Sequence, residues 1–233
     1  MKKNLFIILF AVSVAGVFAG ILLHLKWLDY LCKPLIMISI GGYFLQNSKK
    51  IDKKTVRFAL IAFLFSLFGD IFLMFTGEGM MFFMLGLGSF LVAQIGYIFL
   101  FRHTLKLFGN QSYIRKNPLL LIGYLVFGGI VYYLLFNQLD IVLKIAVLVY
   151  MLALLGMSAM ALNRFKSVSS VSFYLVFAGS VLFVISDTLI ALDKFFSPIP
   201  NDRLLVMSTY IAAQFLIMMG ILKQFEKHSL RFL

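Results

Sequence analysis

Two aspartates lie deep inside apolar stretches of this chain, Asp70 in FSLFGDIFLMF and Asp187 in VLFVISDTLIA. A carboxylate in hydrocarbon is costly and rare, so each one marks a functional site by default. Two carboxylates held close together share a proton, so that one serves as an acid and the other as a base. We therefore expect a catalytic acid/base pair. The alternative is that each carboxylate only bonds to Ser, Tyr or Lys side chains and holds helices together.

The elements that must position these acids are membrane-spanning helices. Hydrophobic residues make up 62% of the 233-residue chain, in long apolar stretches with short polar breaks, and this pattern is typical of multiple membrane spans. No run of alternating strands is evident, which argues against a barrel. The sequence predicts an all-α polytopic membrane bundle in a single domain over residues 1–233. Its eight transmembrane helices cover about 4–23, 31–46, 57–76, 80–101, 118–136, 141–162, 172–193 and 203–222.

The distribution of charge predicts the orientation of the bundle. The net charge is +12, but the Lys and Arg residues gather in alternate loops between spans. This placement indicates topology and contact with anionic lipid headgroups, not a nucleic-acid partner. By the positive-inside rule both termini are cytoplasmic, in an integral protein of a bacterial inner (cytoplasmic) membrane. Val17-Phe18-Ala19 resembles a signal-peptide cleavage pattern, yet we expect an uncleaved first span.

The order of polar residues along the spans indicates an internal repeat. Gly69-Asp70 and Gln94 lie in spans 3 and 4, and Ser186-Asp187 and Gln214 lie in spans 7 and 8. Four spans separate the copies, so the chain would consist of two parallel four-helix repeats related by an axis along the membrane normal. The alternative is chance similarity between apolar helices.

The rise of a helix gives the depth of each candidate residue. At 1.5 Å per residue, Asp70 lies roughly 20 Å from the cytoplasmic end of its span, and Asp187 lies about 9 Å from the outer end of its own. Tyr210 is about 10 Å into the eighth span, and Gln214 follows one turn deeper on the same face. We expect these residues to line one cleft in the outer half of the bundle, apolar below to hold one lipid chain.

Three further residues are candidate substrate contacts. Lys33 opens the second span with Pro34, and it could pair with a carboxylate, bind a lipid phosphate or anchor the helix at the interface. Ser66 stacks on the face of Asp70 by helical spacing. Gln94 fits helix packing better than chemistry, and Tyr210 and Gln214 could equally be polar links between helices.

Other chemistries have little support in the sequence. The single Cys32 cannot form an intrachain disulfide, and no Cys/His set has zinc spacing. No Ser lies in a G-x-S-x-G elbow, so nucleophilic catalysis is not expected. A transporter is the main alternative class, but all four prolines lie at predicted span ends instead of breaking helices near the midplane. A lipid-binding or receptor-like bundle would not need two acids at matched depth.

The ordered combination of Lys33-Pro34, Gly69-Asp70, Ser186-Asp187 followed by LDKFFSPIPNDR, and Tyr210-Ile211-Ala212-Ala213-Gln214 resembles the lysoplasmalogenase (YhhN-like) family of integral membrane proteins. The resemblance covers nearly the whole chain. The family usually has His where this chain has Gln94 in FLVAQIGY.

This resemblance implies an eight-helix enzyme that cleaves the vinyl ether bond of lysoplasmalogens into a fatty aldehyde and a glycerophospho-alcohol. It also implies site roles for Lys33, Asp70, Asp187, Tyr210 and Gln214. Vinyl ether hydrolysis proceeds by protonation of carbon and capture of an oxocarbenium-like cation by water, which needs one protonated acid and one ionised carboxylate. We therefore expect a lipid substrate from the bilayer and no metal or cofactor; the oligomeric state is left open.

Overall fold

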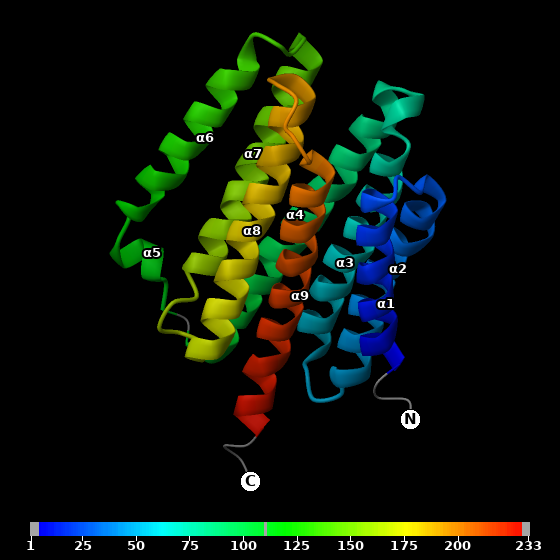
Figure 1. Ribbon diagram of the computed structural model, residues 1–233. Coiled ribbons are helices and arrows are strands. Elements are labelled where there is room, and N and C mark those ends of the chain that lie inside the picture. The colour runs from blue at the N-terminus through cyan, green and yellow to red at the C-terminus, as the bar shows by residue number, and fades with distance from the viewer. Residues whose placement is uncertain (1–4, 110, 230–233) are drawn as a thin grey trace. The chain divides into compact units, whose positions relative to one another are not determined.

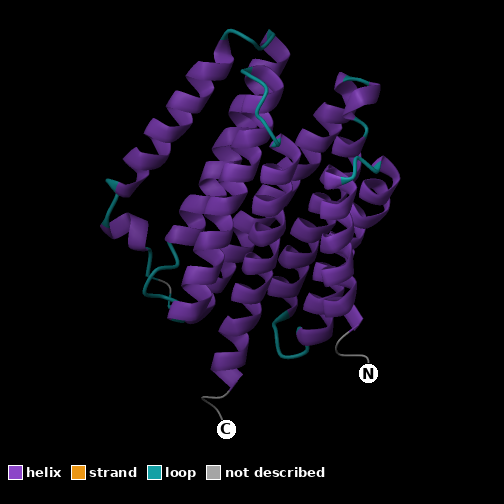
Figure 2. Cartoon of the chain, viewed as in Figure 1, coloured by secondary structure: helices purple, strands orange, loops and turns teal. Residues whose placement is uncertain are grey.

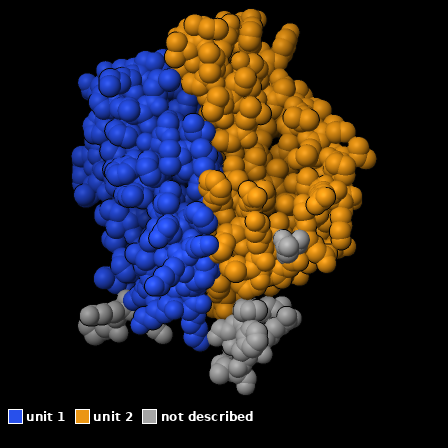
Figure 3. Space-filling view, turned by 180° about the vertical axis from the view of Figure 1, so that it is seen from behind, with its two compact units in different colours: residues 1–97 blue, residues 98–233 orange. Residues whose placement is uncertain are grey.

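The computed structural model describes residues 5–109 and 111–229, and side chains through residue 226. Over these residues the chain is helical, with no strand (Figure 2). It forms two compact units, residues 1–97 and 98–233 (Figure 3). The predicted all-helical membrane fold is confirmed. Seven of the described helices are long and apolar enough to cross a membrane, and an eighth apolar helix has 17 residues.

The first unit contains the helices that carry Lys33, Asp70 and Gln94 (Figure 1). In chain order they are α1 (Leu5–Leu22), α2 (Lys26–Asn47), α3 (Lys53–Met74), a short 3-10 helix η2 (Thr76–Glu78) and the first part of α4 (Met80–Phe108). Asp52 caps α3, because its carboxylate accepts hydrogen bonds from the backbone N–H groups of Lys54 and Thr55 at 3.1 and 3.0 Å. This cap fixes where α3 starts.

The second predicted span is longer than the sequence indicated. We expected it to cover 31–46, but α2 begins at Lys26 and has 22 residues. Polar residues in its first turn, Lys26 and Asp29, interrupt the apolar pattern and hide the helix start. Pro34 consequently lies inside the helix and not at its first position, and Lys33 is about 11 Å into α2 at the usual rise per residue. The expectation that Lys33-Pro34 opens the helix was wrong.

The second unit contains the helices that carry Asp187, Tyr210 and Gln214. After the end of α4 it comprises α5 (Tyr113–Lys116), α6 (Leu120–Phe136), α7 (Ile141–Leu162), α8 (Ser170–Phe195) and α9 (Asp202–Ser229). Asp140 caps α7 by accepting from the Leu143 N–H at 2.8 Å, and Ser169 caps α8 by accepting from the Ser172 N–H at 3.3 Å.

Two glycines allow α8 and α9 to pack closely. A Cβ on Gly179 would lie 2.8 Å from the carbonyl oxygen of Ala213, and one on Gly220 would lie 2.6 Å from Val176 Cγ2. Small residues at such contacts let backbones approach, which is the usual way for membrane helices to gain packing energy. This packing fixes the helix that carries Asp187 beside the helix that carries Tyr210 and Gln214.

A buried arginine holds the turn between α7 and α8. Arg164 is fully buried, its Nη2 donates to Ser172 Oγ at 2.9 Å, and its guanidinium carbon lies 5.6 Å from the centre of the Phe101 ring. Burial lowers the pKa of this guanidinium to about 9, so it remains charged at neutral pH. The contact ties the start of α8 to the end of α7.

Candidate active site

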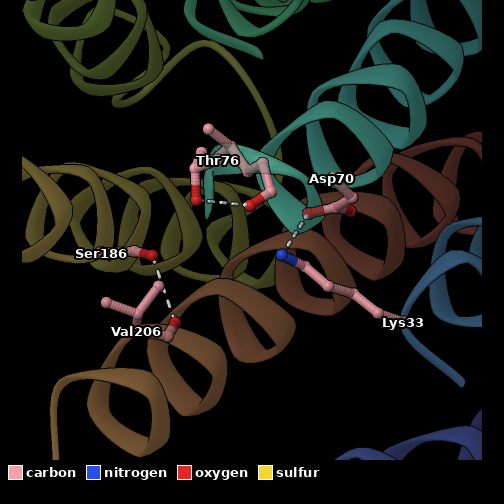
Figure 4. Close-up of polar contacts among 6 residues, drawn as sticks. Lys33, Asp70, Thr76, Ser186 and Val206 are labelled. Atoms are coloured by element: carbon pink, nitrogen blue, oxygen red, sulfur yellow. Dashed lines mark hydrogen bonds and ion pairs between the residues drawn. The ribbon is translucent and has the colours of Figure 1, made fainter. Parts of the chain in front are cut away.

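Asp70 is paired with a cation from α2. Its Oδ1 lies 3.8 Å from Lys33 Nζ, and the two side chains are 3% and 16% exposed (Figure 4). This separation is longer than a charge-assisted hydrogen bond of about 2.7–2.9 Å. Among the described residues, the Lys33 ammonium makes no hydrogen bond to the protein. It therefore keeps N–H donors available for an anionic group while it neutralises the carboxylate.

Close packing of α3 against α4 positions Asp70. A Cβ on the preceding Gly69 would lie 2.5 Å from the Phe90 ring, so only glycine admits the aromatic ring at this point. Ser66, one turn earlier on the Asp70 face, is fully buried. The Asp70 carboxylate is therefore held in a tightly packed section of the first unit.

Gln94 on α4 carries an unusual buried amide. The residue is fully buried, and neither its Nε2 nor its Oε1 has a hydrogen-bond partner in the described part of the chain. An unsatisfied buried amide is costly and calls for water or a ligand atom as its partner. An amide both donates and accepts, so it is suited to hold a water molecule.

Asp187 is paired with a tyrosine that sequence reasoning missed. The hydroxyl of Tyr150, on α7, donates a hydrogen bond to Asp187 Oδ2, and both residues are buried. The pair is separated by 37 positions, and Tyr150 lies in an apolar span with no motif around it. The only signal in the sequence is the hydroxyl of Tyr150 inside a predicted membrane helix, because a buried tyrosine hydroxyl usually needs a hydrogen-bond partner.

The remaining predicted residues of the second unit are buried on α8 and α9. Ser186 donates to the carbonyl oxygen of Val206 at 3.2 Å (Figure 4). The Tyr210 ring meets the Phe183 ring edge-on, with ring centres 5.6 Å apart. Gln214 is fully buried. The Ser186 hydroxyl is thus used between α8 and α9, and Tyr210 is fixed next to α8.

The two buried acids differ in their partners. Asp70 has the Lys33 ammonium beside it, and one oxygen of Asp187 accepts a hydrogen bond from the Tyr150 hydroxyl. Carboxyl groups in different environments can take different roles in acid/base chemistry. Within the residues that the structure describes, no group of three or more His, Cys, Asp or Glu side chains is placed to hold a metal ion.

Comparison with known proteins places the chain in a family. The sequence profile of the YhhN family matches residues 28–221, which include all the candidate site residues. The chain belongs to the YhhN family. It is an integral membrane protein with several apolar helices long enough to span a bilayer.

Relatives in this family carry a functional name. The chain is 29% identical to "Lysoplasmalogenase TMEM86A" of Bos taurus over 205 residues, 87% of this chain and 78% of the relative, and the Homo sapiens protein of the same name gives the same figures. It is 32% identical to "Lysoplasmalogenase TMEM86B" of Sus scrofa over 140 residues, 60% of this chain and 54% of the relative. No solved structure matches the chain significantly.

Proposed function

We propose that this protein is a membrane hydrolase that cleaves the vinyl ether bond of lysoplasmalogen-type lipids. The observation that carries the proposal is the asymmetric partnering of the two buried acids: a lysine ammonium beside Asp70 and a tyrosine hydroxyl on Asp187. Membership in the YhhN family and the name of the mammalian relatives support the substrate class.

The proposed reaction starts with proton transfer from the neutral Asp187 carboxyl to the β-carbon of the vinyl ether. The α-carbon and its ether oxygen then share a positive charge, as in the oxocarbenium-like cation of glycoside hydrolysis. The Tyr150 hydroxyl bonds to the oxygen that does not transfer the proton, and it stabilises the carboxylate that forms. This assigns the role of acid, which the sequence left open, to Asp187.

Water completes the reaction in this proposal. Asp70, ionised beside Lys33, takes a proton as water attacks the α-carbon, and the buried amide of Gln94 orients that water. The resulting hemiacetal breaks its bond to the glycerol oxygen, which takes the proton held by Asp70, while the hemiacetal hydroxyl gives its proton to Asp187 and becomes the aldehyde carbonyl. The products are a fatty aldehyde and a glycerophospho-alcohol. The net reaction consumes one water and needs no oxidant or reductant.

The remaining site residues serve binding. The Lys33 ammonium has donors available for the phosphate of the headgroup. Tyr210, Gln214 and Ser66 are buried polar residues that we assign to substrate positioning. We assign the bilayer as the source of the lipid substrate. By the positive-inside rule we also assign both termini to the cytoplasm.

The test is incubation of the purified protein with a lysoplasmalogen and detection of the aldehyde by mass spectrometry. The matched control is the saturated ether with the same headgroup and chain, which has no carbon to protonate. We expect aldehyde from the vinyl ether alone. Equal cleavage of the saturated ether, or of an ester lysolipid, would exclude this mechanism. Accumulation of intact lipid in protein-containing vesicles without cleavage would favour a transporter.

A further inference from the structure

A cavity of about 280 Å³ opens between three helices of the second unit. In Figure 1, α6 lies to one side of α7 and α8, which overlap in this view. The lining residues come from Leu120 to Phe127 of α6, from Leu155 and Ser158 of α7, and from Val181 to Ile185 of α8. Because α6 is exposed along most of its length, this groove lies on a face that meets the bilayer.

The hydroxyl groups in the groove wall are already engaged in hydrogen bonds within the protein. The Tyr124 hydroxyl and Ser158 Oγ are 3.2 Å apart, and Ser158 Oγ lies 3.2 Å from Ser180 Oγ. Ser180 in turn donates to the carbonyl oxygen of Phe177 at 2.7 Å. A ligand in the groove therefore meets a surface that is apolar apart from satisfied hydroxyls. Such a lining suits hydrocarbon and gives a headgroup nothing to bind.

The groove lies near the Asp187–Tyr150 pair along two helices, although neither residue lines it. Val184 lines the groove and lies three residues before Asp187 on α8, about one helical turn. Leu155 lines it and lies five residues after Tyr150 on α7. The lining residues of α8 thus begin two positions before Asp187 and extend toward the start of the helix.

We propose that this groove binds the hydrocarbon chain of a single-chain lipid whose ether end lies at Asp187. The proposal rests on the proposed function, because it takes Asp187 to act at the first carbons of that chain. The length of the groove then limits the length of the hydrocarbon chain that the enzyme accepts. A chain inside the bilayer is already in an apolar medium, so entering the groove gains little from the hydrophobic effect. Selectivity comes from exclusion of chains that are too long for the space.

Gly123 provides a direct test, since it lines the groove and a Cβ built on it meets no atom within 4 Å. Gly129, also on α6, is equally open but does not line the groove. We would measure kcat/KM for vinyl ether lipids of increasing chain length in wild type, Gly123→Phe and Gly129→Phe. A Phe ring at this position would fill part of the groove, so Gly123→Phe should lower the long-to-short ratio about tenfold, which corresponds to about 1.4 kcal/mol. Gly129→Phe should leave the ratio at the wild-type value. Equal ratios in both variants would overturn the proposal.

A second readout separates the groove from the reaction. A saturated-ether lysolipid with a diazirine in its chain is photolysed with each protein, and the labelled peptides are mapped by mass spectrometry. We expect label on groove segments of α6 and α8 in wild type and Gly129→Phe, and its loss in Gly123→Phe. This result would support the groove even if wild type released no aldehyde, which would refute only the proposed function. Label elsewhere, or equal labelling of the groove by a diacyl phospholipid probe, would refute the groove.

Discussion

Replacing Lys33 by Met should destabilise the protein strongly and in a pH-dependent way. Met keeps the length of the side chain but removes the charge that faces Asp70 at 3.8 Å. The Asp70 side chain is only 3% exposed, so bulk water cannot take over the role of the ammonium. The variant must therefore either keep a buried carboxylate without the charge of Lys33 or bind a proton at Asp70.

The option with the lower free-energy cost sets how much stability the Lys33→Met variant loses. Breaking a buried ion pair by removing one partner costs about 3–5 kcal/mol. Protonating an aspartic acid of ordinary pKa costs about 4 kcal/mol at pH 7 and about 1.5 kcal/mol at pH 5, at 1.36 kcal/mol per unit. The loss should therefore be about 3–4 kcal/mol at pH 7 and fall to about 1.5 kcal/mol at pH 5. The sign follows because the folded variant holds a proton that the unfolded chain lacks, so acid favours the folded form.

The assay is reversible unfolding in mixed detergent micelles at pH 5 and pH 7, followed by circular dichroism. Lys144→Met is the matched control, because Lys144 lies over the Phe136 ring at 4.0 Å and forms no ion pair within the described chain. Its replacement should cost about 0.5–1 kcal/mol at either pH. Adding Asp70→Asn to Lys33→Met should recover most of the loss. Equal losses for the two lysines, without pH dependence, would refute the described pairing.

Two further substitutions test the second unit. Tyr150→Phe removes the donor to Asp187 and should lower the free energy of unfolding by about 1–3 kcal/mol and turnover by roughly tenfold; an unchanged protein would show that the hydroxyl is dispensable. Gly179→Ala places a Cβ 2.8 Å from the Ala213 carbonyl and should cost about 1–3 kcal/mol in the same unfolding assay. Gly129→Ala, in open space, should instead stabilise by up to about 1 kcal/mol, and equal effects of the two changes would contradict the described helix contact.

The sequence predicted the helical fold well because span length and apolar composition are local properties. The start of α2 was missed for the same reason. Lys26 and Asp29 are polar, so the apolar pattern begins later in the sequence, and Lys33-Pro34 then resembles a helix start. The structure shows that the helix includes its polar first turn, and Lys33 therefore lies deep enough to reach Asp70.

The partners of the candidate residues could be predicted only in part. Lys33 was a candidate for pairing with a carboxylate because buried acids in a membrane need a cation or donor. Tyr150 was missed because its contact with Asp187 depends on how α7 packs against α8, and nothing in the sequence around either residue encodes that register. The cleft expected to be lined by Asp70, Asp187, Tyr210 and Gln214 stays a prediction, and the groove in the second unit, which none of these residues lines, was not predicted. Its walls on α6, α7 and α8 are set by tertiary packing.

The central claim is that Asp187 protonates a vinyl ether carbon while Asp70 assists the attack of water. The most direct measurement is lysoplasmalogen hydrolysis in D₂O, with the aldehyde trapped as it forms and analysed by mass spectrometry. We predict one deuterium on the carbon next to the aldehyde group. Folded Asp70→Asn and Asp187→Asn variants should each lose at least roughly 100-fold in turnover, as expected for general acid–base groups. Aldehyde without deuterium, or near wild-type turnover in both variants, would contradict the account.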